Sequence, residues 1–254
     1  MSSRKTHETF ARQRQSISKF TPAMEGVHAS NFSTRAALPK SAIQGWYDWV
    51  LDRLGPKELR RRMWHFAPGV GALLTLAFPR QQPLELQWLV VTVAFCVVIA
   101  CVAIHFQRTI RRPGEHDCLP SILGYAVAII PLFFLFPAFP ELPLTVAAIV
   151  AFGDGSATLV GRLAGDNKLP WNAHKSWLGT MAFVLAALPL ATLIYWSEST
   201  PHKPLEAALF CVGPAVLATA LVESLPFRCN DNIFVGGTAA LSMIAMRGIV
   251  LGWS

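Results

Sequence analysis

One acidic residue stands directly after a long apolar run, among residues that are almost all small. Asp154 follows the run PLTVAAIVAF and lies in the stretch AFGDGSATLVGRLAG, residues 151–165. A carboxylate at membrane depth is costly, so it normally faces a cavity, a cation or a partner. Its small neighbours allow close backbone packing and also leave room for a ligand: Gly153, Gly155, Ser156, Gly161 and Gly165. The stretch predicts either a ligand site at Asp154 or a close-packed helix face whose acid pairs with Arg162 or a lysine.

The following segment, DNKLPWNAHKSWLGT (residues 166–180), is rich in cations. Lys168, His174 and Lys175 fall within eight residues. Lysine binds phosphate as a point charge. Ser176 is placed to cap the next helix, whose N-terminal N–H groups would add donors to an anion site. An ordinary basic loop with a helix cap is the alternative, and the sequence contains neither a P-loop pattern nor G-x-G-x-x-G.

Two further groups of residues could complete a metal and phosphate site. Glu223 ends an apolar run, and Asp231 and Asn232 open the next one. Oxygen ligands from separate elements suit Mg²⁺, which one or two carboxylates hold together with phosphate oxygens. Helix capping by Asn230 or Asp231 is the alternative, but it explains Glu223 poorly. His65, in ELRRRMWHFAPG, is expected to act as a base or a phosphate contact, or else to lie at the membrane interface.

Together these residues provide what phosphoryl transfer requires. A metal bridges phosphates, lysines offset developing charge, and a positioned group handles the acceptor. The apolar segments would supply a lipid alcohol from the bilayer. On the residues alone, the sequence predicts a metal–phosphate site without naming the reaction.

The elements that position these residues are expected to be membrane helices. Hydrophobic residues make up 53% of the chain and charged residues only 15%, against about 25% charged in soluble domains. We therefore predict an all-α, polytopic transmembrane bundle of about seven spans, each long enough for a core of about 30 Å. The five cysteines form no C-x-x-C pair, so neither disulfides nor a zinc site is expected. The spans are placed near residues 63–79, 86–106, 119–139, 142–163, 177–197, 204–225 and 233–251.

Charge sets the expected orientation. Twelve of the 22 lysines and arginines lie in the first 62 residues. Beside a membrane domain such an arm indicates lipid headgroups rather than nucleic acid. We divide the chain into a basic cytosolic arm with an interfacial helix, residues 1–57, and a transmembrane catalytic domain, residues 58–254. Connections on the arm's side carry seven cations against two opposite, which predicts a cytosolic N-terminus and a site on the cytosolic face. The seven are Arg108, Arg111, Arg112, Arg162, Lys168, Lys175 and Arg228, and the two are Arg80 and Lys203.

The stretch GDGSATLVGRLAGDNKLPWNAHKSWLGT, residues 153–180, resembles the signature of the CTP-dependent polyprenol kinase family. That family includes dolichol, phytol and farnesol kinases and a fungal-type diacylglycerol kinase. The matching residues are Gly153, Asp154, Ala157, Gly161, Gly165, Lys168, Lys175, Ser176, Gly179 and Thr180. A family element near the end is matched by Glu223, Asp231 and Asn232, and a basic stretch running into a histidine by Arg61, Arg62 and His65. The resemblance covers about residues 58–251.

The resemblance implies transfer of the γ-phosphate of CTP to a lipid hydroxyl, with Mg²⁺. It assigns Asp154 and Asp231 to the metal or the acceptor, and Glu223 to the metal or to the role of base. Nucleotide and phosphate contacts would come from Lys168, Lys175, Ser176, Thr180, Asn232, Gly153, Gly155, Gly161 and Gly165. The acceptor would be phytol, farnesol, geranylgeraniol, dolichol or diacylglycerol, and the modest length favours the smaller, phytol-kinase-like members.

Two other functions are considered. The signature is distantly similar to that of phosphatidate cytidylyltransferases, and Trp177 after Lys175-Ser176 fits them. Those enzymes usually add a Gly-Gly…Asp-Arg-x-Asp element, whereas here Gly236 and Gly237 lack the Asp-Arg pair. A CTP:lipid-phosphate cytidylyltransferase is therefore the second hypothesis. A non-enzymatic membrane transporter or scaffold is the third, and the gathering of polar residues on one side argues against it.

Overall fold

The computed structural model describes residues 41–77, 86–106, 119–226 and 231–253. Contacts divide the chain into two units, Met1–Ser41 and Ala42–Ser254. Residues 1–40 of the predicted arm lie outside the described residues, as do the connection 107–118 and Arg228. The predicted interfacial helix belongs to the unit that begins at Ala42 and packs with the bundle. The division after residue 57 stays a prediction.

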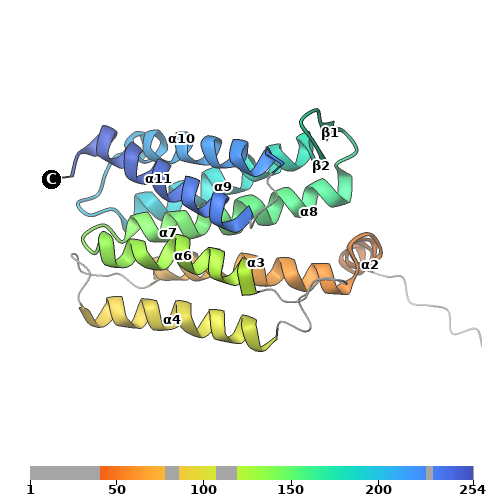
Figure 1. Ribbon diagram of the computed structural model, residues 1–254, viewed down its shortest axis with the longest axis horizontal. Coiled ribbons are helices and arrows are strands. Elements are labelled where there is room, and N and C mark those ends of the chain that lie inside the picture. Colours follow the sequence, from red (N-terminus) through yellow and green to blue (C-terminus); the bar gives the residue numbers. More distant parts are fainter. Residues whose placement is uncertain (1–40, 78–85, 107–118, 227–230, 254) are drawn as a thin grey trace, which may run out of the picture. The chain divides into compact units, whose positions relative to one another are not determined.

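The unit from Ala42 is a bundle of helices whose long members run side by side (Figure 1). They fall on each of the seven segments that the sequence predicted. A 3₁₀ turn, Thr75–Ala77, extends α3, and a π-helical segment, Ile149–Asp154, joins α7 to α8. The helices are α2 (Ala42–Leu54), α3 (Pro56–Leu74), α4 (Leu86–His105), α6 (Leu119–Leu135), α7 (Glu141–Ala148), α8 (Gly155–Ala164), α9 (Trp177–Glu198), α10 (Leu205–Ser224) and α11 (Asp231–Leu251).

Four of these segments are long and apolar enough to cross a bilayer: Glu141–Ala164, Trp177–Glu198, Leu205–Ser224 and Asn232–Leu251. Two shorter apolar helices, Val90–His105 and Ile122–Leu135, accompany them within the described residues. The chain is thus an all-α membrane protein. The count of seven spans and the cytosolic N-terminus stay predictions.

The span Glu141–Ala164 lies at the centre of the bundle. Its most apolar window is 72% buried, whereas the corresponding windows of the other three spans are 33–39% buried. Alanines and glycines let its neighbours approach closely. For example, a Cβ on Gly69 of α3 would lie 2.7 Å from the Cβ of Ala151. The π-helical segment ends at Asp154, and such segments occur frequently at functional sites.

Helix α2 turns away from the other helices and is seen end-on in Figure 1. Gly55, with φ of 75°, makes the corner, and Pro56 then starts α3 at a position where a missing N–H costs nothing. Val50 is buried against the bundle, while Ile43, Trp46 and Trp49 are exposed. Exposed aromatic residues of this kind suit the predicted position at a bilayer surface.

A short β-hairpin, absent from the all-α prediction, connects α8 to α9. Its strands are β1 (Lys168–Leu169) and β2 (Asn172–Ser176), paired antiparallel. Asn172 Nδ2 donates to the Ser224 carbonyl at 3.1 Å, which fixes the hairpin on the end of α10. The predicted helix cap is confirmed, since Ser176 Oγ accepts from Gly179 N at 3.1 Å at the start of α9.

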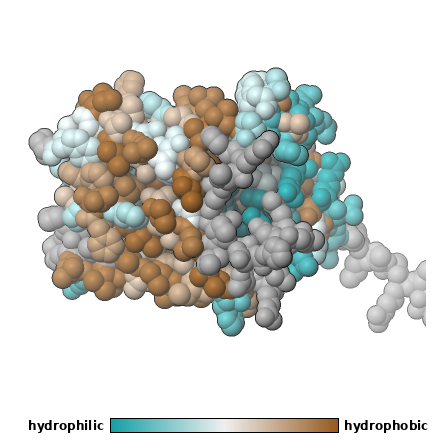
Figure 2. Space-filling model, viewed as in Figure 1, coloured by the Kyte–Doolittle hydropathy of each residue, from teal (hydrophilic) through white to brown (hydrophobic). Residues whose placement is uncertain are grey.

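Polar residues gather at one end of the bundle. Figure 2 shows apolar residues over most of the visible face and hydrophilic ones near the hairpin and α2. At the opposite end, where α7 begins and α11 ends (Figure 1), a buried ion pair joins Arg247 Nε to Glu141 Oε1 at 3.4 Å. Arg247 stacks 3.5 Å from the ring centroid of Phe139 and donates to the Gly252 carbonyl at 2.5 Å. This pair fastens α11 to the start of the central span.

Candidate active site

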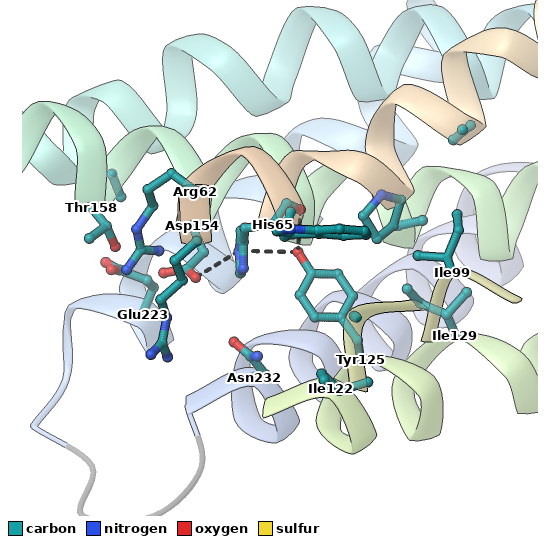
Figure 3. Close-up of a pocket in the computed structure, with 18 of the residues that line it drawn as sticks. Arg62, His65, Ile99, Ile122, Tyr125, Ile129, Asp154, Thr158, Glu223 and Asn232 are labelled. Atoms are coloured by element: carbon teal, nitrogen blue, oxygen red, sulfur yellow. Dashed lines mark hydrogen bonds and ion pairs between the residues drawn. The ribbon is translucent and has the colours of Figure 1, made fainter. Parts of the chain in front are cut away.

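A single cavity of about 930 Å³ reaches from the polar end into the middle of the bundle. One half is lined by charged and polar side chains from α2, α3, α8, the hairpin, α10 and α11. The other half is lined by apolar side chains from α3, α4, α6 and α7. Figure 3 shows this division, with Arg62, Thr158 and Glu223 on one side of Tyr125 and Ile99 and Ile129 on the other. The cavity can therefore hold a polar and an apolar ligand end to end.

Three side chains meet where the two halves join. His65 Nε2 on α3 lies 2.8 Å from Asp154 Oδ2 and 3.1 Å from the hydroxyl of Tyr125 on α6. Because an ionised carboxylate only accepts hydrogen bonds, Nε2 carries the proton in this arrangement. The Tyr125 hydroxyl also lies 3.3 Å from the His65 carbonyl, to which it donates. His65 and Asp154 thereby hold each other in place at the inner edge of the polar half (Figure 3).

A second acid–base pair lies in the polar half. Lys175 on β2 pairs with Glu223 at the end of α10, 48 positions along the chain, and Glu223 is buried. The hairpin brings the lysine there because Asn172 fastens it to α10. Lys168 Nζ donates to the Gly165 carbonyl at 2.8 Å and also lines the cavity. The two lysines that the sequence assigned to phosphate thus border one space with Asp154.

Arginines form the outer wall of the polar half. Arg62 is buried and makes two hydrogen bonds to Glu58 Oε1, at 2.8 and 3.1 Å. Arg162 Nη1 lies 3.6 Å from the same oxygen, so the predicted alternative of an Asp154–Arg162 pair is not what the structure shows. Arg53 Nη1 on α2 donates to the Leu163 carbonyl at 2.7 Å and ties α2 to α8. The wall is well suited to anionic ligands because guanidinium groups match phosphate geometry.

The apolar half is a channel along the axes of the helices. Helix α4 forms its outer wall, with Phe95, Ile99 and Ala103 among the lining residues. Helix α4 packs mainly on α6 and α3, and several of its described side chains, such as Val90, Val91 and Val98, are exposed. The other lining side chains are apolar or small, including Ala72, Ile122, Ala126, Ile129, Ile130, Phe133, Leu144 and Ala147.

Most of the residues that the sequence singled out line this cavity. They are His65, Asp154, Gly161, Gly165, Lys168, Lys175, Ser176, Thr180, Glu223 and Asn232. Gly153 and Gly155 instead serve packing: a Cβ on Gly153 would meet the ring of Phe183, and one on Gly155 would lie 2.6 Å from Phe66 Cε1. Asp231 begins α11, and its side chain lies outside the described residues.

The donor chemistry of the polar half fits a hard cation such as Mg²⁺. Asp154 and Glu223 provide carboxylates and Asn232 an amide oxygen around one space, and Mg²⁺ needs only one or two carboxylates beside phosphate oxygens. The described residues contain no group of three His, Cys, Asp or Glu side chains close enough to hold a metal without other ligands. The nucleotide phosphates would therefore have to complete the coordination shell.

Tyr125, Thr158 and Arg53 are among the polar lining residues that the sequence analysis did not single out. Tyr125 carried a usable signal, because a tyrosine in the middle of the apolar segment ILGYAVAIIP is a polar group at membrane depth. Thr158 and Arg53 carried no such signal, since a threonine on a helix and an arginine at a helix end are common.

Sequence comparisons connect the chain with known enzymes. It is 29% identical to phytol kinase 1, chloroplastic, of Arabidopsis thaliana over 134 residues, which is 50% of this chain and 44% of that protein. It is 26% identical to a probable phytol kinase, chloroplastic, of Triticum aestivum over 242 residues, 84% of this chain and 81% of the relative. It is 27% identical to farnesol kinase, chloroplastic, of Arabidopsis thaliana over 146 residues, 54% of this chain and 48% of that one.

The chain spans about half the length of most of the curated relatives that it matches. No family model matches it. No solved structure matches it either. The resemblance to phosphatidate cytidylyltransferases stays a prediction. The similarity to phytol and farnesol kinases confirms the resemblance predicted from residues 153–180.

Proposed function

We propose that this protein is a CTP-dependent kinase that transfers the γ-phosphate to the hydroxyl of an isoprenoid alcohol drawn from the membrane. The observation that carries the proposal is the two-part cavity, whose cationic half and apolar half meet at His65, Asp154 and Tyr125. The two substrates match the two halves of the cavity, because a nucleotide is polar and charged whereas a lipid alcohol is mostly apolar. The kinase names of the relatives support the reaction class.

The nucleotide would occupy the polar half, where its phosphates meet Lys168, Lys175 and the arginines of the wall. Positioned cations lower the barrier to phosphoryl transfer by offsetting charge that develops on the transferred group. Glu223 holds Lys175 in one orientation, so no reorganisation is needed when the charge develops. Asp154, Glu223 and Asn232, with Asp231 as a further predicted ligand, would hold Mg²⁺, which would supply positive charge beside the phosphates.

The acceptor hydroxyl would lie at the junction, with its tail in the apolar channel. Asp154 is the group best placed to accept the hydroxyl proton, because its carboxylate lines the cavity at the junction and contacts His65 through Oδ2. Tyr125 fixes the orientation of His65, and His65 fixes that of Asp154. Alignment of acceptor and donor within one cavity then contributes much of the rate.

The test is a product assay on the purified full chain in detergent, with Mg²⁺ and CTP labelled at the γ-phosphate. The acceptors are farnesol, geranylgeraniol, phytol, diacylglycerol and phosphatidate. Label in an isoprenyl phosphate with release of CDP is the expected result. Label released as pyrophosphate, with a CDP-lipid formed from phosphatidate, would replace the kinase by the cytidylyltransferase.

Parallel reactions with labelled ATP and with Asp154→Asn complete the assay. The ATP reaction tests the choice of nucleotide, which depends on the family resemblance alone. Full turnover by Asp154→Asn would remove Asp154 from the proposed chemistry. Absence of both product formation and CTP binding would favour a transporter or scaffold.

A further inference from the structure

The lining of the apolar channel can be followed along four helices from the junction toward the opposite end of the bundle. On α3 the lining runs ten residues from His65 to Thr75, and on α6 eight residues from Tyr125 to Phe133. At a rise of 1.5 Å per residue these lengths are about 15 Å and about 12 Å. The central span and α4 agree, since the lining runs eleven residues from Asp154 to Pro143 and eleven from Ala103 to Thr92, about 16 Å each. The last lining residues on these helices mark the deep end of the channel, about 12 to 16 Å from the junction. They are Thr75, Phe133, Pro143 and Thr92.

At that end the channel meets packed residues. Phe133 is only 2% exposed, and Pro143 is buried at the start of the central span. Thr75 Oγ1 lies 2.6 Å from Glu198 Oε1 of α9, whose side chain is buried. An apolar tail that continued past this end would have to displace Phe133 or separate the Thr75–Glu198 hydrogen bond. Both changes are costly, because a packed core would lose contacts and a hydrogen bond to a buried carboxylate would be broken.

We propose that Phe133, with Thr75 and Pro143, forms the floor of the channel and sets the upper limit on the tail length of the acceptor. This inference rests on the proposed lipid-alcohol kinase function. An extended carbon chain with bonds near 1.5 Å advances about 1.3 Å per bond, so about 12 to 16 Å holds roughly nine to twelve bonds. That is the main chain of a three-unit isoprenoid, and a four-unit tail fits when bent. Polyprenols of many units are excluded.

The experiment measures kcat/KM for prenols of two to ten isoprene units with the full chain in detergent. Phe133→Ala deepens the channel, and Phe134→Ala is its matched control, because Phe134 is adjacent on α6 but exposed and outside the cavity lining. Cys96→Phe fills the channel from α4, where neighbours are few. Cys101→Phe is the control for that change, since Cys101 is exposed and does not line the cavity.

The wild-type protein is expected to prefer three or four units and to lose at least about tenfold in kcat/KM beyond five, in line with discrimination by an apolar pocket. Phe133→Ala should move the optimum at least one unit longer, and Cys96→Phe at least one unit shorter. Phe134→Ala and Cys101→Phe should keep the wild-type profile. Equal use of ten-unit prenols by the wild type, or a Phe133→Ala profile identical to that of Phe134→Ala, would overturn the floor.

A binding measurement separates this inference from the proposed function. The same prenols are incubated with each variant without nucleotide, and those retained on the purified protein are quantified by mass spectrometry. Length-dependent retention that shifts in Phe133→Ala or Cys96→Phe supports the floor even if no prenol is phosphorylated, a result that would refute the kinase alone. If retention is independent of prenol length in all variants, the proposed floor is refuted, whether or not the protein phosphorylates prenols.

Discussion

The bundle contains buried ion pairs at both ends, and the two ends differ in what surrounds the charges. At the polar end, His65–Asp154 and Lys175–Glu223 border a cavity of about 930 Å³. At the other end, Arg247–Glu141 is enclosed by Phe139, which stacks on the guanidinium at 3.5 Å, and by a backbone carbonyl. Neither Arg247 nor Glu141 lines that cavity.

The surroundings of a charge in an apolar helix therefore indicate its role. Ionisable residues inside a membrane are costly, so each indicates either a function or a packing contact that repays the cost. Open space beside the charge favours function, because a ligand can reach it. Aromatic stacking on every free face favours a role in holding helices together. Substitutions at the two ends should therefore affect different quantities.

The largest effect on turnover is expected for Asp154→Asn. Loss of the proton acceptor should lower kcat about a thousandfold, within the usual contribution of general acid–base catalysis. Asparagine is isosteric and can still accept from His65 Nε2, so the melting temperature should stay close to that of the wild type. Steady-state kinetics and thermal unfolding in detergent measure the two quantities. Asp52→Asn, on the exposed side of α2, is the matched control with full activity expected.

The largest effect on stability is expected for Arg247→Met at the opposite end. Removing one partner of a buried pair leaves Glu141 uncompensated and should lower the free energy of unfolding by about 3 to 5 kcal/mol. Turnover per folded molecule should remain near the wild-type value, because the pair lies outside the cavity. Thermal unfolding and active-site-normalised kinetics are the measurements.

The double variant Arg247→Met with Glu141→Leu distinguishes a pairing effect from a simple packing defect. If the pair explains the loss, the double variant should recover most of the stability, since apolar replacements of similar size often substitute for a buried ion pair. If the losses in the free energy of unfolding are additive in the double variant, Arg247 and Glu141 do not stabilise the bundle as a pair. A fall in kcat that matches that of Asp154→Asn would contradict the comparison between the two ends.

A smaller loss of turnover is expected for Lys175→Met. Loss of a preorganised cation should lower kcat/KM for the nucleotide about a hundredfold. Because the change leaves Glu223 buried without its lysine, thermal unfolding of Lys175→Met and of Lys175→Met with Glu223→Gln is measured beside the kinetics to separate misfolding from lost phosphate binding. Lys57→Met, at the same end but outside the cavity lining, is the control. Unchanged kinetics in both Lys175 variants would remove the lysine from the phosphate site.

Much of this arrangement was accessible from the sequence, for a physical reason. Apolar runs of about 20 residues fix where helices lie, and all seven predicted segments are helical. Asp154, Lys175 and Glu223 were identified because charged groups are rare in such a chain, and the cavity brings them together. The capping role of Ser176 followed from local hydrogen bonding, which sequence position alone determines.

The features that the sequence did not predict depend on which helices are neighbours in the fold. The partner of Asp154 is His65, 89 positions earlier, and no local pattern selects it over Arg162. Gly153 and Gly155 were assigned to the nucleotide because small residues suit both ligands and packing, and only the positions of Phe183 and Phe66 decide for packing. The hairpin was not predicted, because strands of two and five residues are too short to show a clear alternation of apolar and polar residues.

The smallest effect is expected for Tyr125→Phe, which removes one hydroxyl at the junction of the two halves of the cavity. The change removes the contacts to His65 Nε2 at 3.1 Å and to the His65 carbonyl at 3.3 Å, while the ring stays in place. A hydrogen bond of this kind contributes about 1 kcal/mol, so kcat should fall about fivefold. KM for the nucleotide should not change, because Tyr125 lies on the channel side of His65 (Figure 3). Tyr47→Phe, on the exposed face of α2, is the control. A rise in nucleotide KM with kcat intact would mean that Tyr125 acts in the polar half and does not position His65 for the acceptor.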